Sequence, residues 1–368
     1  MKIDALKPIF DLFQIEGTAT VADDYGSGHI NDTYRVHVDT PEGEALYILQ
    51  RINHLIFTQP VELMDNVQRV TAHVAQKILA RGGDPLRETL TLVPTREGEN
   101  YALVGENYWR VYLFVSGATG YDMIEDERHV TAAAKAFAQF QKDVADMPAP
   151  RLHETIPGFG DTGWRFEQFE QALAADVAGR AKECQAEIDF CLARKADANV
   201  LMNLLREKKI PERITHYDTK INNVLIDDAT GKGLCVIDLD TVMPGVAMYD
   251  FGDSVRTATA LGAEDETDLS KVGFSLERFE LLAEGYLSVA KEFLTDIEID
   301  HLAFAAKIVA FTIGLRFIAD HLAGDVYFKT HRENQNLDRC RTQLRLVHEL
   351  ERHEQDFNQF IKSLVPKL

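Results

Sequence analysis

The sequence is poor in cysteine, in long apolar runs and in positive charge. Its four cysteines include no Cys-x-x-Cys pair, which argues against a zinc or redox site of that spacing and favours free thiols in a reducing compartment. The N-terminal segment carries Asp4 and Asp11 and has no continuous apolar stretch, so it is not typical of a signal peptide. The longest apolar run, residues 303–315, includes Lys307 and is too short to cross a bilayer. We therefore expect a cytoplasmic protein with no membrane partner.

The shortage of positive charge is pronounced. Thirty-nine Lys and Arg stand against 59 Asp and Glu, which gives a formal net charge of −20 at pH 7. Nucleic-acid backbones are bound by clustered Lys and Arg, so a nucleic acid is not expected as the main partner. Any site for an anionic small molecule must then supply its cations locally. With 45% hydrophobic residues in 368, the chain can bury a large core in two or three units or in one two-lobed fold.

The secondary-structure pattern changes along the chain. Up to about residue 116 we expect strands and turns around one helix at 60–81, and beyond residue 117 mainly long helices. An island predicted to be β-rich, residues 213–242, interrupts the helical part, and the Pro- and Gly-containing segment 146–164 predicts a long loop. These patterns divide the chain into 1–116 and 117–368.

The β-rich island holds a predicted hairpin with polar ends. Two apolar runs, 224–226 and 234–237, flank a turn-rich segment, and antiparallel pairing about Thr230–Gly231 places Asn223 opposite Asp238. An amide and a carboxylate at the open end of a hairpin offer the oxygen ligands that Mg²⁺ prefers. We expect a magnesium site there.

A carboxylate stands five residues before Asn223. The order His216-Tyr217-Asp218, followed by Asn223, has the His-x-Asp-x-x-x-x-Asn spacing of the catalytic loop of kinases. Phosphoryl transfer needs an acid that accepts a hydroxyl proton beside metal-neutralised phosphates. The pattern therefore predicts Asp218 as the catalytic base.

Phosphates also need donors and a cation. Gly26 and Gly28, in the segment 26–31, lie between predicted strands, where backbone N–H groups can contact phosphate oxygens. Arg51 lies on the strand predicted at 47–53 and is the expected cation. Glu62 is the nearest candidate for its acidic partner, but a glutamate in a first helical turn is favoured by the helix dipole alone.

These residues resemble a known family. The segments HYDTKINN (216–223) and CVIDLD (235–240) are similar to the aminoglycoside phosphotransferase and choline kinase superfamily. Longer segments, such as YGSGHINDTYRV (25–36) and GLRFIADHLAGDVYF (314–328), are most similar to the N-acetylhexosamine 1-kinases within it. The resemblance implies an α+β, protein-kinase-like two-lobed fold, with a small β-rich N-lobe, a larger helical C-lobe and an active site in the cleft.

The resemblance also implies roles for single residues. Asp218 would be the base facing the anomeric hydroxyl of the sugar, and ATP and Mg²⁺ would be the cofactors. The implied metal residues are Asn223 and Asp238, with Asp240 as a further ligand or a group that orients the ligands; the residues near the nucleotide phosphates are Gly26, Gly28 and Arg51; and those of the sugar pocket are His29, Arg316 and Tyr327. Asp250 resembles the aspartate that fixes the catalytic loop from beneath. One departure is Gly160, where the similar segment would carry a histidine.

Other functions remain open. The same fold can phosphorylate an amino alcohol, a methylthio sugar or an aminoglycoside, although an arginine in the pocket argues against a cationic acceptor. A nucleotide-binding module whose catalysis has decayed is a second alternative. A metallohydrolase built from His216, Asp218, Asp238 and Asp240 is a third, and it lacks further histidines at suitable spacing. In each case we expect small-molecule partners and a monomer or weak dimer.

Overall fold

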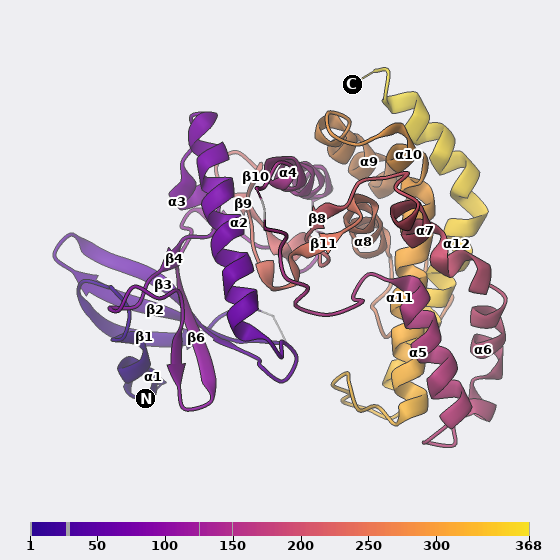
Figure 1. Cartoon of the computed structure of the whole chain (residues 1–368), viewed down its shortest axis with the longest axis horizontal. Helices are drawn as coiled ribbons and strands as arrows, with labels where there is room; N and C mark the ends of the chain where they lie inside the picture. The colour runs from indigo at the N-terminus through magenta and orange to yellow at the C-terminus, as the bar shows by residue number, and fades with distance from the viewer. Residues whose placement is uncertain (1, 27–29, 125, 149, 368) are drawn as a thin grey trace. The chain divides into compact units, whose positions relative to one another are not determined.

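An antiparallel sheet in the N-terminal part and a large set of helices in the C-terminal part make this an α+β protein, as expected (Figure 1). The computed structural model describes residues 2–26, 30–124, 126–148 and 150–367. Two compact units share them. Unit 1 comprises residues 1–123, 143–156 and 222–243, and unit 2 comprises 124–142, 157–221 and 244–368. Unit 1 thus takes two later segments of the chain in addition to its N-terminal stretch.

The main sheet of unit 1 has the strand order β1-β2-β3-β6-β4, with β5 paired to β6. Consecutive strands β1, β2 and β3 are antiparallel neighbours. The elements of this unit are α1 (Lys2–Phe10), β1 (Thr18–Asp24), β2 (Asp32–Thr40), β3 (Gly43–Ile52), α2 (Pro60–Ala80), α3 (Pro85–Glu88), β4 (Leu92–Val93), β5 (Ala102–Val104), β6 (Asn107–Leu113), β7 (Ala118–Thr119), β9 (Val224–Asp227), β10 (Gly233–Val236) and the 3₁₀ helix η4 (Leu239–Thr241).

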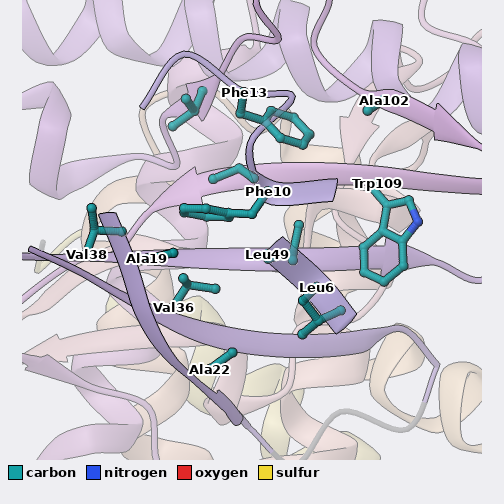
Figure 2. Packing of buried hydrophobic residues seen from close by; sticks show 12 residues of the cluster. Leu6, Phe10, Phe13, Ala19, Ala22, Val36, Val38, Leu49, Ala102 and Trp109 are labelled. Atoms are coloured by element: carbon teal, nitrogen blue, oxygen red, sulfur yellow. The ribbon is translucent and has the colours of Figure 1, made fainter. Parts of the chain in front are cut away.

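One face of the sheet is covered by the N-terminal helix α1. Figure 2 shows Leu6 and Phe10 of this helix lying against Val36 and Leu49 of the sheet, and all four side chains are buried. Burying such side chains contributes about 1.5–3 kcal/mol each. The sequence pattern predicted a single helix before residue 116, which is wrong: α1 and the short α3 are also present. Helix α1 is only nine residues long and contains a proline, so its pattern is too short to identify.

The predicted helix at 60–81 is confirmed as α2. Proline stands at its first position, where the missing N–H costs nothing. Leu63, Val67 and Ile78 are buried, whereas Leu79 is exposed. Helix α2 therefore places a continuous apolar stripe inside unit 1.

The predicted hairpin is present as β9 and β10, but the predicted register differs from the observed one by one residue at the open end. Val224 pairs with Val236, and the pairing is irregular between Gly233 and Cys235. Consequently the N–H of Ile237, rather than a group of Asp238, is opposite Asn223 and donates to its carbonyl at 2.9 Å. The irregularity absorbs one residue that a regular ladder would have paired.

Unit 2 is built around the helix α11, which packs against α5, α8 and α12 (Figure 1). The elements of this unit are α4 (Arg128–Val144, whose last residues belong to unit 1), α5 (Thr162–Ala175), η1 (Ala181–Glu183), α6 (Gln185–Leu192), η2 (Lys195–Asn199), α7 (Val200–Arg206), β8 (Arg213–Thr215), α8 (Ala247–Thr259), α9 (Leu276–Ala290), α10 (Asp296–Asp300), α11 (Leu302–Ala323) and α12 (Gln335–Leu364), with η3 (Ile221–Asn223) and β11 (Met243–Gly245) at its boundaries with unit 1.

Helix α11 is long and apolar enough to cross a membrane by length and composition, yet 78% of its most apolar 18-residue window is buried inside the protein. Lys307 on this helix lies 3.1 Å from Asp197 and 3.2 Å from Glu354. At Gly252 of α8, a Cβ atom would lie 2.5 Å from the carbonyl oxygen of Ala305. Glycine therefore permits α8 and α11 to approach closely, as core helices do.

All four cysteines are buried and unpaired. Burial raises the pKa of the Cys191 thiol and of the Cys235 thiol to about 12. Thiols of this kind stay protonated at neutral pH and pack as small apolar side chains.

Candidate active site

The predicted catalytic loop is held by Asp250, as the family resemblance led us to expect. Its carboxylate accepts hydrogen bonds from the backbone N–H groups of His216 at 2.9 Å and Tyr217 at 2.8 Å. Gln141 donates a third hydrogen bond, at 2.7 Å. Burial raises the pKa of Asp250 to about 7, while the three hydrogen bonds act in the opposite direction. The loop is thus held from the interior of unit 2 by one fully buried carboxyl group.

Asp218 follows directly on this anchored segment. Its carboxylate is partly exposed and lies 3.0 Å from the ammonium group of Lys220. The neighbouring Asp218 raises the pKa of Lys220. The preceding His216 is fully buried, with its ring against Phe137 and Phe140, and its Nδ1 accepts from the N–H of Asp218 at 3.3 Å. The histidine of the motif therefore supports the loop, and the aspartate is the more exposed of the two side chains.

Tyr217 has a left-handed backbone conformation, with φ of +68°. This backbone form is rare for a residue with a Cβ and is found where the surroundings determine it. The Tyr217 ring packs edge-on against Tyr249 and Phe159. A Cβ atom at Gly160 would lie 2.2 Å from the Tyr217 ring. The glycine at position 160, in place of the histidine of similar sequences, therefore makes room for Tyr217.

The chain crosses from unit 2 to unit 1 between Ile221 and Asn222, so Asp218 belongs to one unit and the expected metal residues to the other. The Asn223 side chain is buried, and Asp238 is exposed at the start of η4 with φ of +59°. The Ile237–Asn223 backbone hydrogen bond holds both residues at the same end of the hairpin. An amide oxygen and a carboxylate suit a hard cation, so this donor set fits Mg²⁺.

The described residues contain no group of three or more His, Cys, Asp or Glu side chains that could hold a metal ion. A site made from Asn223 and Asp238 would leave the remaining positions of Mg²⁺ to water and phosphate oxygens, which is the usual arrangement for this ion.

Asp240 has two protein partners, one for each carboxylate oxygen. Arg110 Nη1 lies 2.6 Å from Oδ1, and Asn31 Nδ2 donates to Oδ2 at 2.7 Å. Arg110 also donates to Gln50 Oε1 through Nε at 3.0 Å and Nη2 at 2.8 Å. Asp240 and the acidic residues near it raise the pKa of Arg110 against the opposing effect of burial. Asp240 is thereby tied to the main sheet of unit 1.

The turn after β1 contributes Gly26, whose φ of +78° is readily adopted only by glycine. Gly28 and His29, expected at the phosphates and in the sugar pocket, lie outside the described residues. Asn31, at the end of this turn, accepts the N–H of Asn53 at 3.0 Å in addition to its bond with Asp240. Asn31 thus links three segments of unit 1.

Arg51 lies on the face of β3 that carries Leu49, which packs against α1. Its guanidinium is 43% exposed and donates to Asp32 at 2.6 Å and to Asn107 at 3.1 Å. Gln50, on the opposite face, is the β3 residue that contacts Arg110. The role of Arg51 at a phosphate stays a prediction.

Glu62, the candidate partner of Arg51, lies 3.8 Å from the imidazole of His153. Among the described residues of unit 1, Arg51 forms its ion pair with Asp32, and no ion pair joins Arg51 to Glu62.

In unit 2, Arg316 is brought together with Tyr327, as the resemblance led us to expect. The guanidinium carbon lies 5.7 Å from the centre of the Tyr327 ring, 5.3 Å from that of Phe328 and 5.0 Å from that of Phe159. Asp320, one turn along α11, accepts the backbone N–H groups of residues 326, 327 and 328. The loop that carries Tyr327 is thus fastened to the helix that carries Arg316.

The sequence reasoning missed two residues of this region. Lys220 could have been found, because it stands two residues after the predicted base in an otherwise recognised motif. Arg110 could not, because nothing in the strand 107–113 distinguishes an arginine that is 1% exposed from one in solvent.

Solved structures of several small-molecule kinases are similar to this chain. A microcompartment-associated aminopropanol kinase has 16% identity and a TM-score of 0.60, with 97% of this chain and 98% of that chain covered. A choline kinase from Cryptosporidium parvum Iowa II has 14% identity and a TM-score of 0.60, with 99% of both chains covered. An amicoumacin kinase, solved in complex with AMP-PNP, Ca²⁺ and Ami, has 12% identity and a TM-score of 0.59, with 95% of this chain and 94% of that chain covered. At these identities the similarity establishes the fold, which is kinase-like.

Family membership rests on a separate match. Residues 23–281, more than half of the chain, match the APH phosphotransferase enzyme family. This range includes the turn after β1, the anchored loop of Asp218 and the hairpin with Asn223 and Asp238. The chain belongs to the phosphotransferase enzyme family and is a small-molecule kinase that acts on an alcohol group.

Proposed function

We propose that the protein is an ATP- and Mg²⁺-dependent kinase that phosphorylates the anomeric hydroxyl of an N-acetylhexosamine, such as N-acetylglucosamine or N-acetylgalactosamine, in the cytoplasm. The observation that carries the catalytic part is the pair of hydrogen bonds that the backbone N–H groups of His216 and Tyr217 donate to the Asp250 carboxylate. It fixes the two residues that precede Asp218, so the base has a defined position. The sugar acceptor is supported by the sequence resemblance, in which Arg316 and Tyr327 take part.

In this proposal Asp218 accepts the proton of the acceptor hydroxyl as its oxygen bonds to the γ-phosphorus of ATP. The bond from that phosphorus to the bridging oxygen breaks, and ADP leaves with the electron pair. Lys220, 3.0 Å from Asp218, orients the carboxylate and places positive charge next to the reacting oxygen. Bound Mg²⁺ would neutralise phosphate charge, and Asn223 and Asp238 would hold it.

We assign Asp240 a positioning role in place of a ligand role, because its Oδ2 accepts a hydrogen bond from Asn31 and its Oδ1 lies in an ion pair with the buried Arg110. Gly26 and Gly28 remain the candidates for backbone contacts to the phosphates. The amicoumacin kinase was solved with a nucleotide analogue and a divalent ion, and a spectinomycin phosphotransferase of TM-score 0.50 with ADP, which supports a nucleotide and a cation here.

An amino alcohol is the second candidate acceptor. It is favoured by the aminopropanol and choline kinases among the similar structures. The two candidates differ in charge, since choline and aminopropanol are cations and an N-acetylhexosamine is neutral.

A panel of acceptors tests the proposal. Release of ADP would be measured with N-acetylglucosamine, N-acetylgalactosamine, choline, aminopropanol and an aminoglycoside, each with and without Mg²⁺. The product would be identified by phosphorus and proton NMR. We expect a sugar 1-phosphate, formed only with Mg²⁺. If only the amino alcohols were phosphorylated, the acceptor would be an amino alcohol and not a sugar. Nucleotide binding without turnover of any acceptor would indicate a module whose catalysis has decayed.

A further inference from the structure

Two arginines of unit 2 meet at one aromatic ring. The guanidinium carbon of Arg165, on α5, lies 5.9 Å from the centre of the Phe159 ring, and that of Arg316, on α11, lies 5.0 Å from the same point. Arg165 also lies over the ring of its neighbour Trp164, at 4.7 Å. Two like charges from different helices thus contact one ring, and the repulsion of Arg165 by Arg316 costs free energy unless an anion or dipole offsets it.

The protein itself supplies no carboxylate partner to either arginine among the residues that the structure describes. Arg165 donates to Gln168 at 3.0 Å through Nη1, and its Nε is buried without a hydrogen-bond partner. The nearby Asp161 already accepts the N–H of Trp164 and pairs with Arg206 at 3.1 Å. The chain has 59 acidic and 39 basic residues, so two arginines at one ring without a carboxylate partner are unexpected unless a ligand uses them.

The electrostatic state of the pair follows from its surroundings. Burial, and then the charge of Arg316, lower the pKa of Arg165 to about 10. Arg165 therefore keeps its proton at neutral pH, and the two guanidinium groups present several N–H donors and no acceptor.

The pair contacts an anchored loop and shares the Phe159 ring with Tyr217 of the catalytic loop. Arg316 contacts the rings of Tyr327 and Phe328, and Asp320 holds the backbone of both residues. The Phe159 ring that joins the arginines packs 5.6 Å from the ring of Tyr217, and the next residue along the chain is the proposed base. An acceptor molecule with its hydroxyl at Asp218 would be within reach of this cluster.

We propose that Arg165 and Arg316 form one subsite for the oxygen atoms of the acceptor, taking a carbonyl or carboxylate group and excluding an ammonium group. This inference rests on the proposed function and narrows it. The donors of the pair match an acetamido carbonyl, whereas an ammonium group would add a third positive charge to two that are already unneutralised. Arg165, which the sequence resemblance did not identify, becomes a residue that determines acceptor class.

One sugar in two charge states tests the subsite. We would measure kcat/KM for glucosamine below and above the pKa of its amine, and for N-acetylglucosamine at the same pH values to correct for changes in the enzyme. For the wild type we expect the ratio of kcat/KM for glucosamine to kcat/KM for N-acetylglucosamine to be at least tenfold lower when the glucosamine amine is protonated than when it is neutral. The double variant Arg165→Met/Arg316→Met should lose most of this pH dependence. Arg352→Met, which removes an exposed arginine of α12 that lies 3.5 Å from Glu349, serves as the matched control and should keep it.

Binding is measured separately by calorimetry with each sugar in the absence of turnover. A wild-type preference that does not change with the charge of the amine, or that survives in the double variant, would overturn the subsite even if the enzyme phosphorylates sugars. Failure to phosphorylate any sugar would overturn the proposed function. In that case charge-dependent sugar binding that the double variant loses would still support the subsite, and its absence would reject both.

Discussion

Arg110 and Asp240 form an ion pair in which both side chains are almost completely buried, at 1% and 2% exposure, with 2.6 Å between Nη1 and Oδ1. The pair joins β6 of the main sheet to the segment just after the proposed metal residue Asp238. A charge in this environment is tolerated only while its partner is present.

Replacing Arg110 by Met should therefore leave a buried carboxylate without its cation. We expect a loss of about 3–5 kcal/mol in the free energy of unfolding, measured by urea denaturation. The double variant Arg110→Met/Asp240→Asn removes both charges and should recover part of this loss. If Arg110→Met alone changes stability by less than about 1 kcal/mol, the value typical of exposed pairs, the pair does not have the structural importance that we give it.

Replacing Asp218 by Asn should remove the proton acceptor while keeping the size of the side chain. We expect kcat to fall by about 10²–10⁴-fold with nucleotide affinity little changed. Steady-state kinetics and calorimetry measure the two quantities. Wild-type turnover in this variant would show that another group accepts the proton.

Replacing Asp238 by Asn should weaken the proposed magnesium site. The expected result is a rise of at least about tenfold in the Mg²⁺ concentration that gives half-maximal rate, since a charged ligand becomes neutral. Asp228→Asn, which removes a carboxylate from the turn end of the same hairpin, is the control and should leave the Mg²⁺ dependence unchanged. Equal effects of the two variants would indicate a general effect of charge.

The raised pKa of Asp250 predicts a pH dependence of stability. With a pKa of about 7 in the folded protein and an ordinary value of 3.8, the folded state binds the proton more tightly than the unfolded state. Asp250 therefore contributes most stability below about pH 4, and this contribution is lost as the pH rises to about 7, by at most about 1.4 kcal/mol per pH unit.

Urea denaturation of the wild type and of Asp250→Asn at several pH values isolates this effect. The difference in unfolding free energy between them should fall from pH 5 to pH 7 and then level off. A difference that rises over this range would mean that the hydrogen bonds from His216, Tyr217 and Gln141 outweigh the desolvation of the carboxylate.

Replacing Gly160 by Ala should displace the Tyr217 ring, since the added Cβ would lie 2.2 Å from it. We expect about 1–3 kcal/mol of destabilisation from overpacking together with a lower kcat, because Tyr217 adjoins the proposed base. Gly273→Ala, where the nearest atom is a leucine methyl at 3.3 Å, is the control. Unchanged kcat in Gly160→Ala would mean that the loop accommodates the shift without moving Asp218.

Much of the fold could be predicted from local sequence patterns. Helix α2 and the helices of unit 2 have long apolar periodicities, and the anchoring of the catalytic loop by Asp250 was implied by the family resemblance. By contrast, the register of β9 and β10 depends on an irregularity near Gly233 that composition does not reveal. A single residue of slip is enough to put Ile237 opposite Asn223.

The partners of single charges were the least predictable part of the site. The strand pattern at 47–53 does not tell which face of the sheet α1 covers. The sequence therefore could not predict that Arg51 lies on the same face as Leu49 and pairs with Asp32. The contact between Arg110 and Asp240 joins residues 130 positions apart and depends on tertiary packing alone.

Asp320 holds the loop of residues 326–328 through the loop's backbone, and this affects how the acceptor preference of the enzyme could be changed. All three donors to its carboxylate are backbone N–H groups, so any residue except proline can occupy these positions without losing the anchor. Asp320 therefore holds the backbone of this loop whichever side chains the loop carries, while the side chains at 327 and 328 determine what contacts Arg316. Libraries that randomise Val326, Tyr327 and Phe328 should yield folded kinases with altered acceptor preference, and this loop is the first place to redesign the enzyme for a new alcohol.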